Sequence, residues 1–279
     1  MNGAFKALAF VLVGCSFSFV PQASAQKPAA TAATTTPAAK PDEKPPVFST
    51  KTEDVTYPSG KDTLTGYLAT PEKPGTHPAI IVIHEWWGLN DWVKEQTQKF
   101  ASLGYEVLAV DLYRGKSAAT PDEAHELSRG LPQDRAMKDL QAAYDYMEAR
   151  KDVTKDRIVV IGWCMGGGYA LEFAVHQPRL SGVVINYGSL PTDPNDLQQI
   201  AAPILGSFGA DDKGITPADV HAFEDAMKKL GKYVEIKIYP GAGHAFENPN
   251  NKTGYRPEDT ADAKSRYLHF FARELGGRP

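Results

Sequence analysis

Continuously apolar runs alternate with segments of helical apolar spacing over most of the chain. The apolar runs, typical of strands covered on both faces, lie at 79–83, 105–112, 157–161, 182–187, 204–208 and 234–239. The helical segments lie at 91–104, 121–129, 134–151, 164–176, 217–230 and 260–275. Two alternating runs, 53–57 and 64–69, precede them and predict an antiparallel pair of strands. The pattern predicts a single α/β domain over 47–279, with a mostly parallel, doubly wound sheet and helices on both faces.

The first 46 residues do not follow this pattern. Lys6, the apolar stretch 7–13 and the small-residue site ending at Ala25 predict a signal peptide over 1–25, whose apolar part is too short to span a bilayer. Residues 12–15 also resemble a bacterial lipobox, so the alternative is a signal that ends before a lipid-anchored Cys15. Residues 26–46 are rich in Pro, Ala and Thr and predict an unfolded linker. Both alternatives predict an exported protein, periplasmic or secreted, without a membrane-spanning segment.

Composition excludes several classes of function. A formal net charge of -4 offers no basic surface for nucleic acid. The glycines at 166–168 lack the residues and spacing of a phosphate-binding or dinucleotide-binding loop, and the histidines lack the spacing of metal ligands. We therefore expect no nucleic-acid partner, no metal and no cofactor, and a monomer that acts on a small molecule.

The predicted strand 157–161 ends in the sequence Gly-Trp-Cys-Met-Gly, with Cys164 at its centre. A buried strand, a nucleophile flanked by glycines and a helix start form the nucleophile elbow of hydrolases, here with cysteine in place of the usual serine. The glycines leave room where strand and helix approach closely. The only other cysteine, Cys15, lies in the signal region, so Cys164 is an unpaired thiol in an exported protein. These observations favour a nucleophile over an inert core cysteine.

Two further candidates follow predicted strands at the same edge of the sheet. Asp212 follows the strand 204–208 and His244 follows the strand 234–239, which is the nucleophile, acid, histidine order of α/β-hydrolase triads. In such a site His244 would take the proton of Cys164, and the carboxylate would orient His244. Asp211, directly before it, is the alternative acid.

An attack by Cys164 on an acyl group would create an oxyanion that needs N–H donors. The predicted donors are the backbone N–H groups of Met165, directly after the nucleophile, and of Trp86, in the loop after the strand 79–83. The side chains of Trp86 and Trp87 either belong to the core or line an acyl pocket.

Five motifs resemble the dienelactone hydrolase family throughout the folded part of the chain: HEWWGLN at 84–90, DLYRG at 111–115, GWCMGGG at 162–168, GADD at 209–212 and GHAFEN at 243–248. The resemblance implies an α/β-hydrolase fold and a cofactor-free hydrolase of cyclic enol esters and related esters, with an activity similar to carboxymethylenebutenolidase. It implies Cys164, Asp212 and His244 as a catalytic triad. It also implies that Glu85 holds the resting thiol as a neutral group until the substrate displaces the carboxylate.

The positions that bind the substrate's carboxylate differ from those of the family. The dienelactone-cleaving enzyme uses two arginines; here Arg114 lies one residue early for the first, and Asn248 occupies the position of the second. Arg114 either binds substrate or pairs with Asp111 or Glu106. The candidate substrate-binding residues are Tyr113, Arg114, Trp87 and Asn248. These differences favour a broader esterase or lactonase with a less acidic substrate.

The predicted function is therefore an exported hydrolase of carboxylic esters or lactones that forms a thioester with Cys164. Two alternatives belong to other classes. The missing arginine at Asn248 is consistent with a non-catalytic binding protein that retains the fold, and the free thiol is consistent with a redox-responsive protein.

Overall fold

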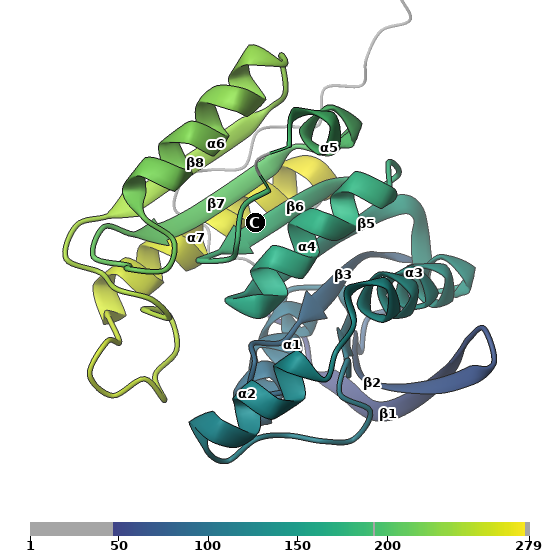
Figure 1. Ribbon diagram of the computed structural model, residues 1–279. Helices are drawn as coiled ribbons and strands as arrows, with labels where there is room; N and C mark the ends of the chain where they lie inside the picture. Colours follow the sequence, from purple (N-terminus) through teal and green to yellow (C-terminus); the bar gives the residue numbers. More distant parts are fainter. Residues whose placement is uncertain (1–46, 192, 277–279) are drawn as a thin grey trace, which may run out of the picture. The chain divides into compact units, whose positions relative to one another are not determined.

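The computed structural model describes residues 47–191 and 193–276, which are built around one eight-stranded sheet (Figure 1). Its strands are β1 Thr50–Ser59, β2 Asp62–Pro71, β3 His77–Ile83, β4 Glu106–Val110, β5 Val153–Trp163, β6 Gly182–Asn186, β7 Ile204–Gly209 and β8 Val234–Tyr239. They lie side by side in the order β1-β2-β4-β3-β5-β6-β7-β8. The β1–β2 and β2–β4 pairs are antiparallel, and all the other pairs are parallel.

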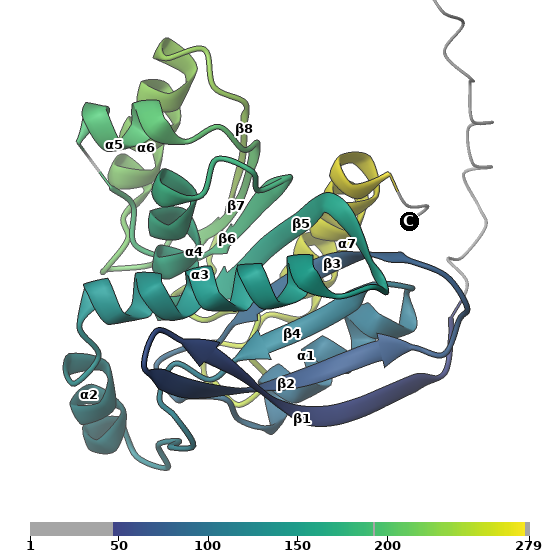
Figure 2. The ribbon, with the colours of Figure 1, turned by 90° about the vertical axis from the view of Figure 1, so that its right-hand side faces the viewer.

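Helices cover both faces of the sheet (Figures 1 and 2). The helices are α1 Asp91–Ser102, α2 Pro121–Arg129, α3 Gln133–Ala149, α4 Met165–His176, α5 Pro194–Gln199, α6 Pro217–Lys229 and α7 Pro257–Leu275. The buried side chains of α1 and α7 pack against one face, and those of α3, α4, α5 and α6 pack against the other. Successive residues of β3 belong alternately to the two cores, which is why this strand is apolar without interruption. The predicted α/β architecture is confirmed.

The parallel strands bring the loops that follow them to one edge of the sheet. The loop after β3 carries Glu85, the loop after β5 carries Cys164, and the loops after β7 and β8 carry Asp212 and His244. Residues far apart in the sequence can therefore meet at this edge.

Several elements differ from the predicted ranges. The strand β5 begins at Val153 rather than at 157. Its first residues are mostly polar and exposed, so they carry no apolar signal. The strands β1 and β2 are also longer than predicted, and they meet in a tight turn in which Gly60 has a φ of 64°. The short helix α5 was not predicted, since Leu197 is its one buried residue and leaves no periodic pattern.

The predicted signal peptide, the lipobox alternative at Cys15 and the linker 26–46 lie outside the described residues. Within 47–191 and 193–276, the structure contains no helix with the length and apolar character needed to cross a membrane.

Candidate active site

Cys164 lies at the sharp turn between β5 and α4. Its φ of 54° and ψ of -120° place a non-glycine residue in a strained region of backbone space. Its N–H donates to the carbonyl of Asn186 at 2.9 Å, and its own carbonyl accepts from Gly167 N–H at 3.0 Å. These bonds at both ends of the residue hold the strained turn in place.

The glycines on either side of Cys164 are needed because backbone segments touch there. A Cβ at Gly162 would lie 2.0 Å from the carbonyl oxygen of Gly166, and a Cβ at Gly166 would lie 2.4 Å from the carbonyl oxygen of Ile83. Both contacts are with backbone, which has no room to move aside. The start of α4 is therefore pressed against the carboxyl end of β3.

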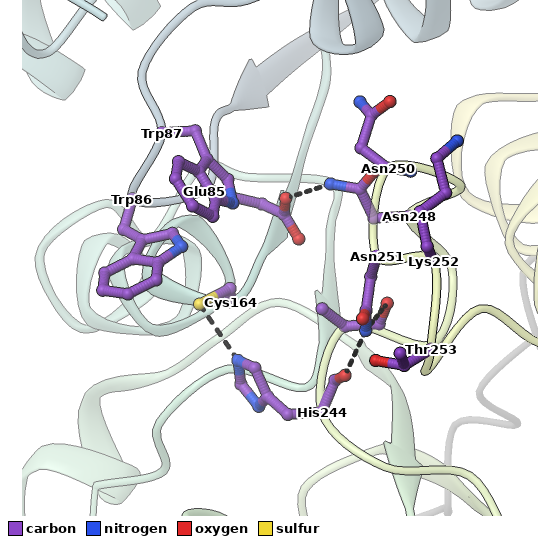
Figure 3. Close-up of a pocket in the computed structure, with 11 residues that line it drawn as sticks. Glu85, Trp86, Trp87, Cys164, His244, Asn248, Asn250, Asn251, Lys252 and Thr253 are labelled. Carbon is purple, nitrogen blue, oxygen red and sulfur yellow. Dashed lines mark hydrogen bonds between the residues drawn. The ribbon is translucent and has the colours of Figure 1, made fainter. Parts of the chain in front are cut away.

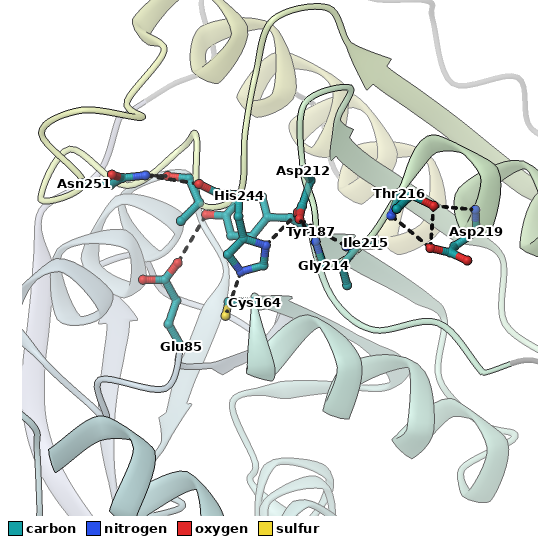
Figure 4. Close-up of polar contacts among 11 residues, drawn as sticks. Glu85, Cys164, Tyr187, Asp212, Gly214, Ile215, Thr216, Asp219, His244 and Asn251 are labelled. Atoms are coloured by element: carbon teal, nitrogen blue, oxygen red, sulfur yellow. Dashed lines mark hydrogen bonds and ion pairs between the residues drawn. The ribbon is translucent and has the colours of Figure 1, made fainter. Parts of the chain in front are cut away.

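His244 lies between Cys164 and Asp212 (Figure 4). Its Nε2 is 3.0 Å from Cys164 Sγ, and its Nδ1 is 2.7 Å from Asp212 Oδ2. The other oxygen of Asp212 accepts from the backbone N–H groups of Gly214 at 2.8 Å and Ile215 at 3.1 Å. Asp211, the alternative acid, is exposed, and within the described residues it forms no hydrogen bond with His244.

The contacts of His244 determine its proton affinity. Burial alone would lower the pKa of His244, but the hydrogen bonds to Asp212 and to Cys164 outweigh burial and raise it to about 10. Burial likewise opposes ionisation of Asp212, but the hydrogen bonds from His244 and from two backbone N–H groups keep its pKa below the usual value. His244 can therefore accept a proton at neutral pH while Asp212 stays ionised.

Glu85 lies in the same pocket but is not bonded to the thiol. The side-chain amide of Asn248 donates to its Oε2 at 2.6 Å (Figure 3), and Tyr187 Oη donates to its Oε1 at 3.4 Å (Figure 4). Glu85 is 1% exposed, and burial raises its pKa to about 7, although the two hydrogen bonds and the charge of His244 lower it. In this structure the hydrogen-bond partner of Cys164 Sγ is His244.

A cavity of about 570 Å³ opens over the thiol. In Figure 3, Trp86 and Trp87 lie on one side of it and the loop after His244 lies on the other. The two indoles meet edge to face at 5.1 Å, and Trp86 also contacts His125 of α2 at 4.8 Å. The lining residues are Glu85, Trp86, Trp87, Cys164, His244, Ala245, Asn248, Asn250, Asn251, Lys252 and Thr253. The tryptophans are therefore part of the pocket wall.

The two predicted oxyanion donors lie on neighbouring segments. Met165 is the first residue of α4, so its N–H has no carbonyl acceptor within the helix. Trp86 lies two residues after His84, whose carbonyl oxygen would lie 2.5 Å from a Cβ on Gly166 at the start of that helix. A free N–H at a helix start also carries the positive end of the helix dipole, which suits a developing negative charge.

Two predicted substrate-binding residues do not line the cavity. Arg114 forms ion pairs with Asp62 at 3.0 Å and with the buried Asp139 at 3.3 Å, so neither predicted partner, Asp111 nor Glu106, was correct. Its positive φ of 56° turns the chain away after Tyr113.

Tyr113 is buried, and its hydroxyl donates to Met165 Sδ at 3.2 Å. Its ring also lies against that of His84 at 4.8 Å. Tyr113 thus packs between His84 and the first residue of α4, next to Cys164 in the sequence.

Sequence reasoning missed the pocket residues after Asn248, namely Asn250, Asn251, Lys252 and Thr253. It also missed Glu247, a buried carboxyl that accepts from Trp163 Nε1 at 3.3 Å. The run of three asparagines within four positions, 248–251, soon after His244 was the one available signal, because such residues fix turns through their side chains. In the described part of the chain, no three His, Cys, Asp or Glu side chains are grouped so that they could hold a metal ion.

Comparisons with known proteins point to one family. The model of the dienelactone hydrolase family matches residues 64–275. A Saccharolobus solfataricus protein provisionally named carboxymethylenebutenolidase is 32% identical in an alignment that covers 79% of this chain and 98% of that protein. A solved structure from Klebsiella pneumoniae, provisionally named a dienelactone hydrolase, has a TM-score of 0.74 and 27% identity over 80% of this chain and 99% of that one. A dienelactone hydrolase-like promiscuous phosphotriesterase from metagenomic libraries has a TM-score of 0.75 and 25% identity over 80% and 98% of the two chains. The α/β-hydrolase fold predicted from the motifs is thereby confirmed.

Proposed function

Because this chain belongs to the dienelactone hydrolase family, a family of hydrolases of small molecules, we propose that it hydrolyses carboxylic esters or lactones through Cys164, His244 and Asp212. The observation that carries the proposal is the unbroken chain of contacts at the carboxyl edge of the sheet. Asp212 Oδ2 is 2.7 Å from one nitrogen of His244, and Cys164 Sγ is 3.0 Å from the other. This is the geometry that a base-activated nucleophile requires.

The reaction proceeds in two halves. His244 takes the proton of Cys164, and the sulfur attacks the acyl carbon to give a tetrahedral oxyanion, which accepts hydrogen bonds from the N–H groups of Met165 and Trp86. The C–O bond then breaks, and His244 gives its proton to the departing oxygen. In the second half, His244 deprotonates a water molecule that attacks the thioester, and the acid product leaves as the proton returns to sulfur.

Asp212 has the role of an orienting group. It accepts from Nδ1–H and so leaves Nε2 facing the thiol, and its lowered pKa keeps it ionised throughout the cycle. Glu85 is the second acid of the pocket. In the resting enzyme its carboxyl would turn from Asn248 to the thiol, and it would release the thiol to His244 when substrate binds; the contacts of Glu85 with Asn248 and of Cys164 with His244 support the released arrangement.

The pocket favours a flat, apolar and weakly charged acyl group. Two indoles form one wall, and an aromatic surface of this kind binds apolar rings. The family's two arginine positions offer no free cation, since Arg114 is held in ion pairs and Asn248 is bonded to Glu85. A neutral ester or lactone therefore fits better than the carboxylate-bearing dienelactone.

Cys164→Ala tests the assignment. The variant should reduce turnover of aryl esters and lactones to background, while Cys164→Ser should keep a weak activity because His244 still serves as base. A matched binding measurement with a non-hydrolysable lactone distinguishes the alternatives. Binding without turnover or covalent labelling in the wild type would favour the non-catalytic function, and rapid reaction of the thiol with peroxide at background ester turnover would favour the redox function.

We also propose that the protein is exported and acts as a monomer. The support for export is the arrangement of residues 1–25, with a lysine, an apolar stretch and a small-residue cleavage site. Mass spectrometry of the mature protein should find Gln26 at the N-terminus, whereas a lipid-modified Cys15 would establish the lipobox alternative and a lipid anchor. Light scattering of the purified protein tests the monomer.

A further inference from the structure

Asn251 ties the loop after β8 to the backbone of His244. Its side-chain amide donates to the carbonyl oxygen of His244 at 3.1 Å and to that of Ala245 at 3.2 Å. Figures 3 and 4 show the amide beside the main chain of His244, opposite the imidazole. One side chain thus binds the two peptide units on which the imidazole depends for its direction.

One of the two residues whose carbonyls accept these bonds, Ala245, has a strained backbone. Ala245 has a φ of 56°, in the left-handed region that costs a residue with a Cβ about 1 kcal/mol or more. Such a conformation persists only where neighbouring contacts hold it, and Ala245 directly follows the residue whose imidazole contacts Cys164. The bonds from Asn251 are contacts of this kind.

The rest of the loop fixes Asn251 itself. Its Oδ1 accepts from Gly254 N–H at 3.2 Å, its backbone N–H donates to the carbonyl of Asn248 at 3.0 Å, and its backbone carbonyl accepts from Tyr255 N–H at 2.9 Å. A Cβ at Gly254 would lie 2.3 Å from Asn251 Nδ2, so the loop leaves no space beside the amide. Every polar group of Asn251 is used, and the residue also forms part of the cavity wall.

We propose that Asn251 is a positioning residue that holds His244 in reach of Cys164 and links the direction of the imidazole to the substrate-facing wall of the pocket. The proposal rests on the proposed function. Asn251 acts through the backbone of His244 and touches none of the reacting atoms. Its loss should therefore lower the rate of the chemical step and the reactivity of the thiol more than it weakens substrate binding.

The test compares Asn251→Ala with two other asparagine variants. Asn251→Ala should lower kcat about tenfold or more and change KM by less than about threefold. Asn250→Ala removes a side chain from the same wall and should change KM alone, and Asn195→Ala, on the exposed start of α5, should change neither. A kcat of Asn251→Ala equal to that of the wild type would overturn the proposal.

A second measurement separates positioning from a merely structural role. The rate at which iodoacetamide alkylates Cys164 reports proton transfer to His244 without any ester substrate. We expect Asn251→Ala to slow it about fivefold at neutral pH, with an unchanged far-ultraviolet circular dichroism spectrum. If the wild type cleaves no ester but this difference remains, the proposed function fails and the positioning role stands.

Glycine at position 245 provides a rescue experiment. Glycine adopts a φ near that of Ala245 without strain, so Asn251→Ala combined with Ala245→Gly should recover at least about threefold in kcat over Asn251→Ala. If Asn251 only stiffened the loop, glycine would loosen it further and lower kcat, which would contradict the proposal. Should Asn251→Ala not fold, Asn251→Asp gives the same test, because it keeps the acceptor for Gly254 N–H and loses only the donors.

Discussion

Glu247 provides a quantitative test of the electrostatics beneath the elbow. Its carboxyl is 1% exposed, accepts from Trp163 Nε1 and forms no ion pair within the described residues. Burial raises its pKa from 4.5 to about 8; the hydrogen bond from Trp163 and the charge of Lys264 lower it, and the charge of Glu85 raises it further. Glu247→Gln keeps the shape and an acceptor oxygen but removes the titrating group.

The direction of the pH dependence of stability follows from which state, folded or unfolded, binds the proton of Glu247 more tightly. The folded protein holds the proton of Glu247 up to about pH 8, whereas the unfolded chain loses it near pH 4.5, so a rise in pH between these values favours unfolding. The stability that neutral Glu247 contributes is complete below pH 4.5 and is lost as pH rises through about 8. A shift of this size corresponds to at most about 5 kcal/mol, and the variant avoids that loss.

Urea unfolding of wild type and Glu247→Gln at a series of pH values from about 5 to about 9 measures the difference. The variant should gain stability relative to the wild type as pH rises, by about 2 kcal/mol or more at the upper end. Glu72→Gln, which removes an exposed carboxyl, is the matched control. A constant difference between Glu247→Gln and wild type across the series would refute the reasoning, and an equal gain in Glu72→Gln would show that net charge rather than burial is responsible.

Three further predictions follow from the site. Asp212→Asn should lower kcat about 10³-fold or more by favouring the wrong tautomer of His244, while Asp211→Asn should stay within about twofold; the reverse ranking in ester kinetics would make Asp211 the acid. Gly166→Ala should cost about 3 kcal/mol in urea unfolding, because its Cβ meets backbone, whereas Gly243→Ala has open space and should cost less than about 1 kcal/mol. Arg114→Gln should cost about 2 kcal/mol, since it leaves a buried carboxylate of α3 without its cation, and should leave KM for a neutral ester unchanged; a raised KM would restore a substrate-binding role.

The fold could be predicted because its central strands are covered on both faces. Continuous apolar runs such as 79–83 have few other interpretations, and they identified the strands that carry the site. The boundaries of exposed elements and the short helix were harder to predict. The exposed half of β5 and the six-residue α5 bury too little to leave a pattern, so their sequences do not differ from those of loops.

The candidate site divides in the same way. Cys164, Asp212 and His244 could be found because each follows a buried strand in a parallel sheet, and topology alone brings such positions together. Arg114 could not be placed, because its partners Asp62 and Asp139 lie 52 residues before and 25 residues after it, and only the tertiary packing of α3 against the β1–β2 hairpin brings them close. The contacts of Asn251 depend on the path of an irregular loop, which has no periodic signal.

Asn248 shows how a single departure from the family pattern alters the chemistry of the pocket. It bonds to Glu85 at 2.6 Å with a neutral amide, where the family's dienelactone-cleaving enzyme has an arginine. An arginine at that distance would stabilise the carboxylate and hold the pKa of Glu85 low, whereas the amide leaves burial as the dominant influence and the pKa of Glu85 rises to about 7. Glu85 can therefore carry a proton near neutral pH through burial alone. A substrate carboxylate would meet this carboxyl with no cation at either arginine position, and the lysine of the cavity wall, Lys252, is exposed, so that solvent screens its charge. This is the physical reason to expect that neutral esters and lactones are hydrolysed in preference to anionic ones.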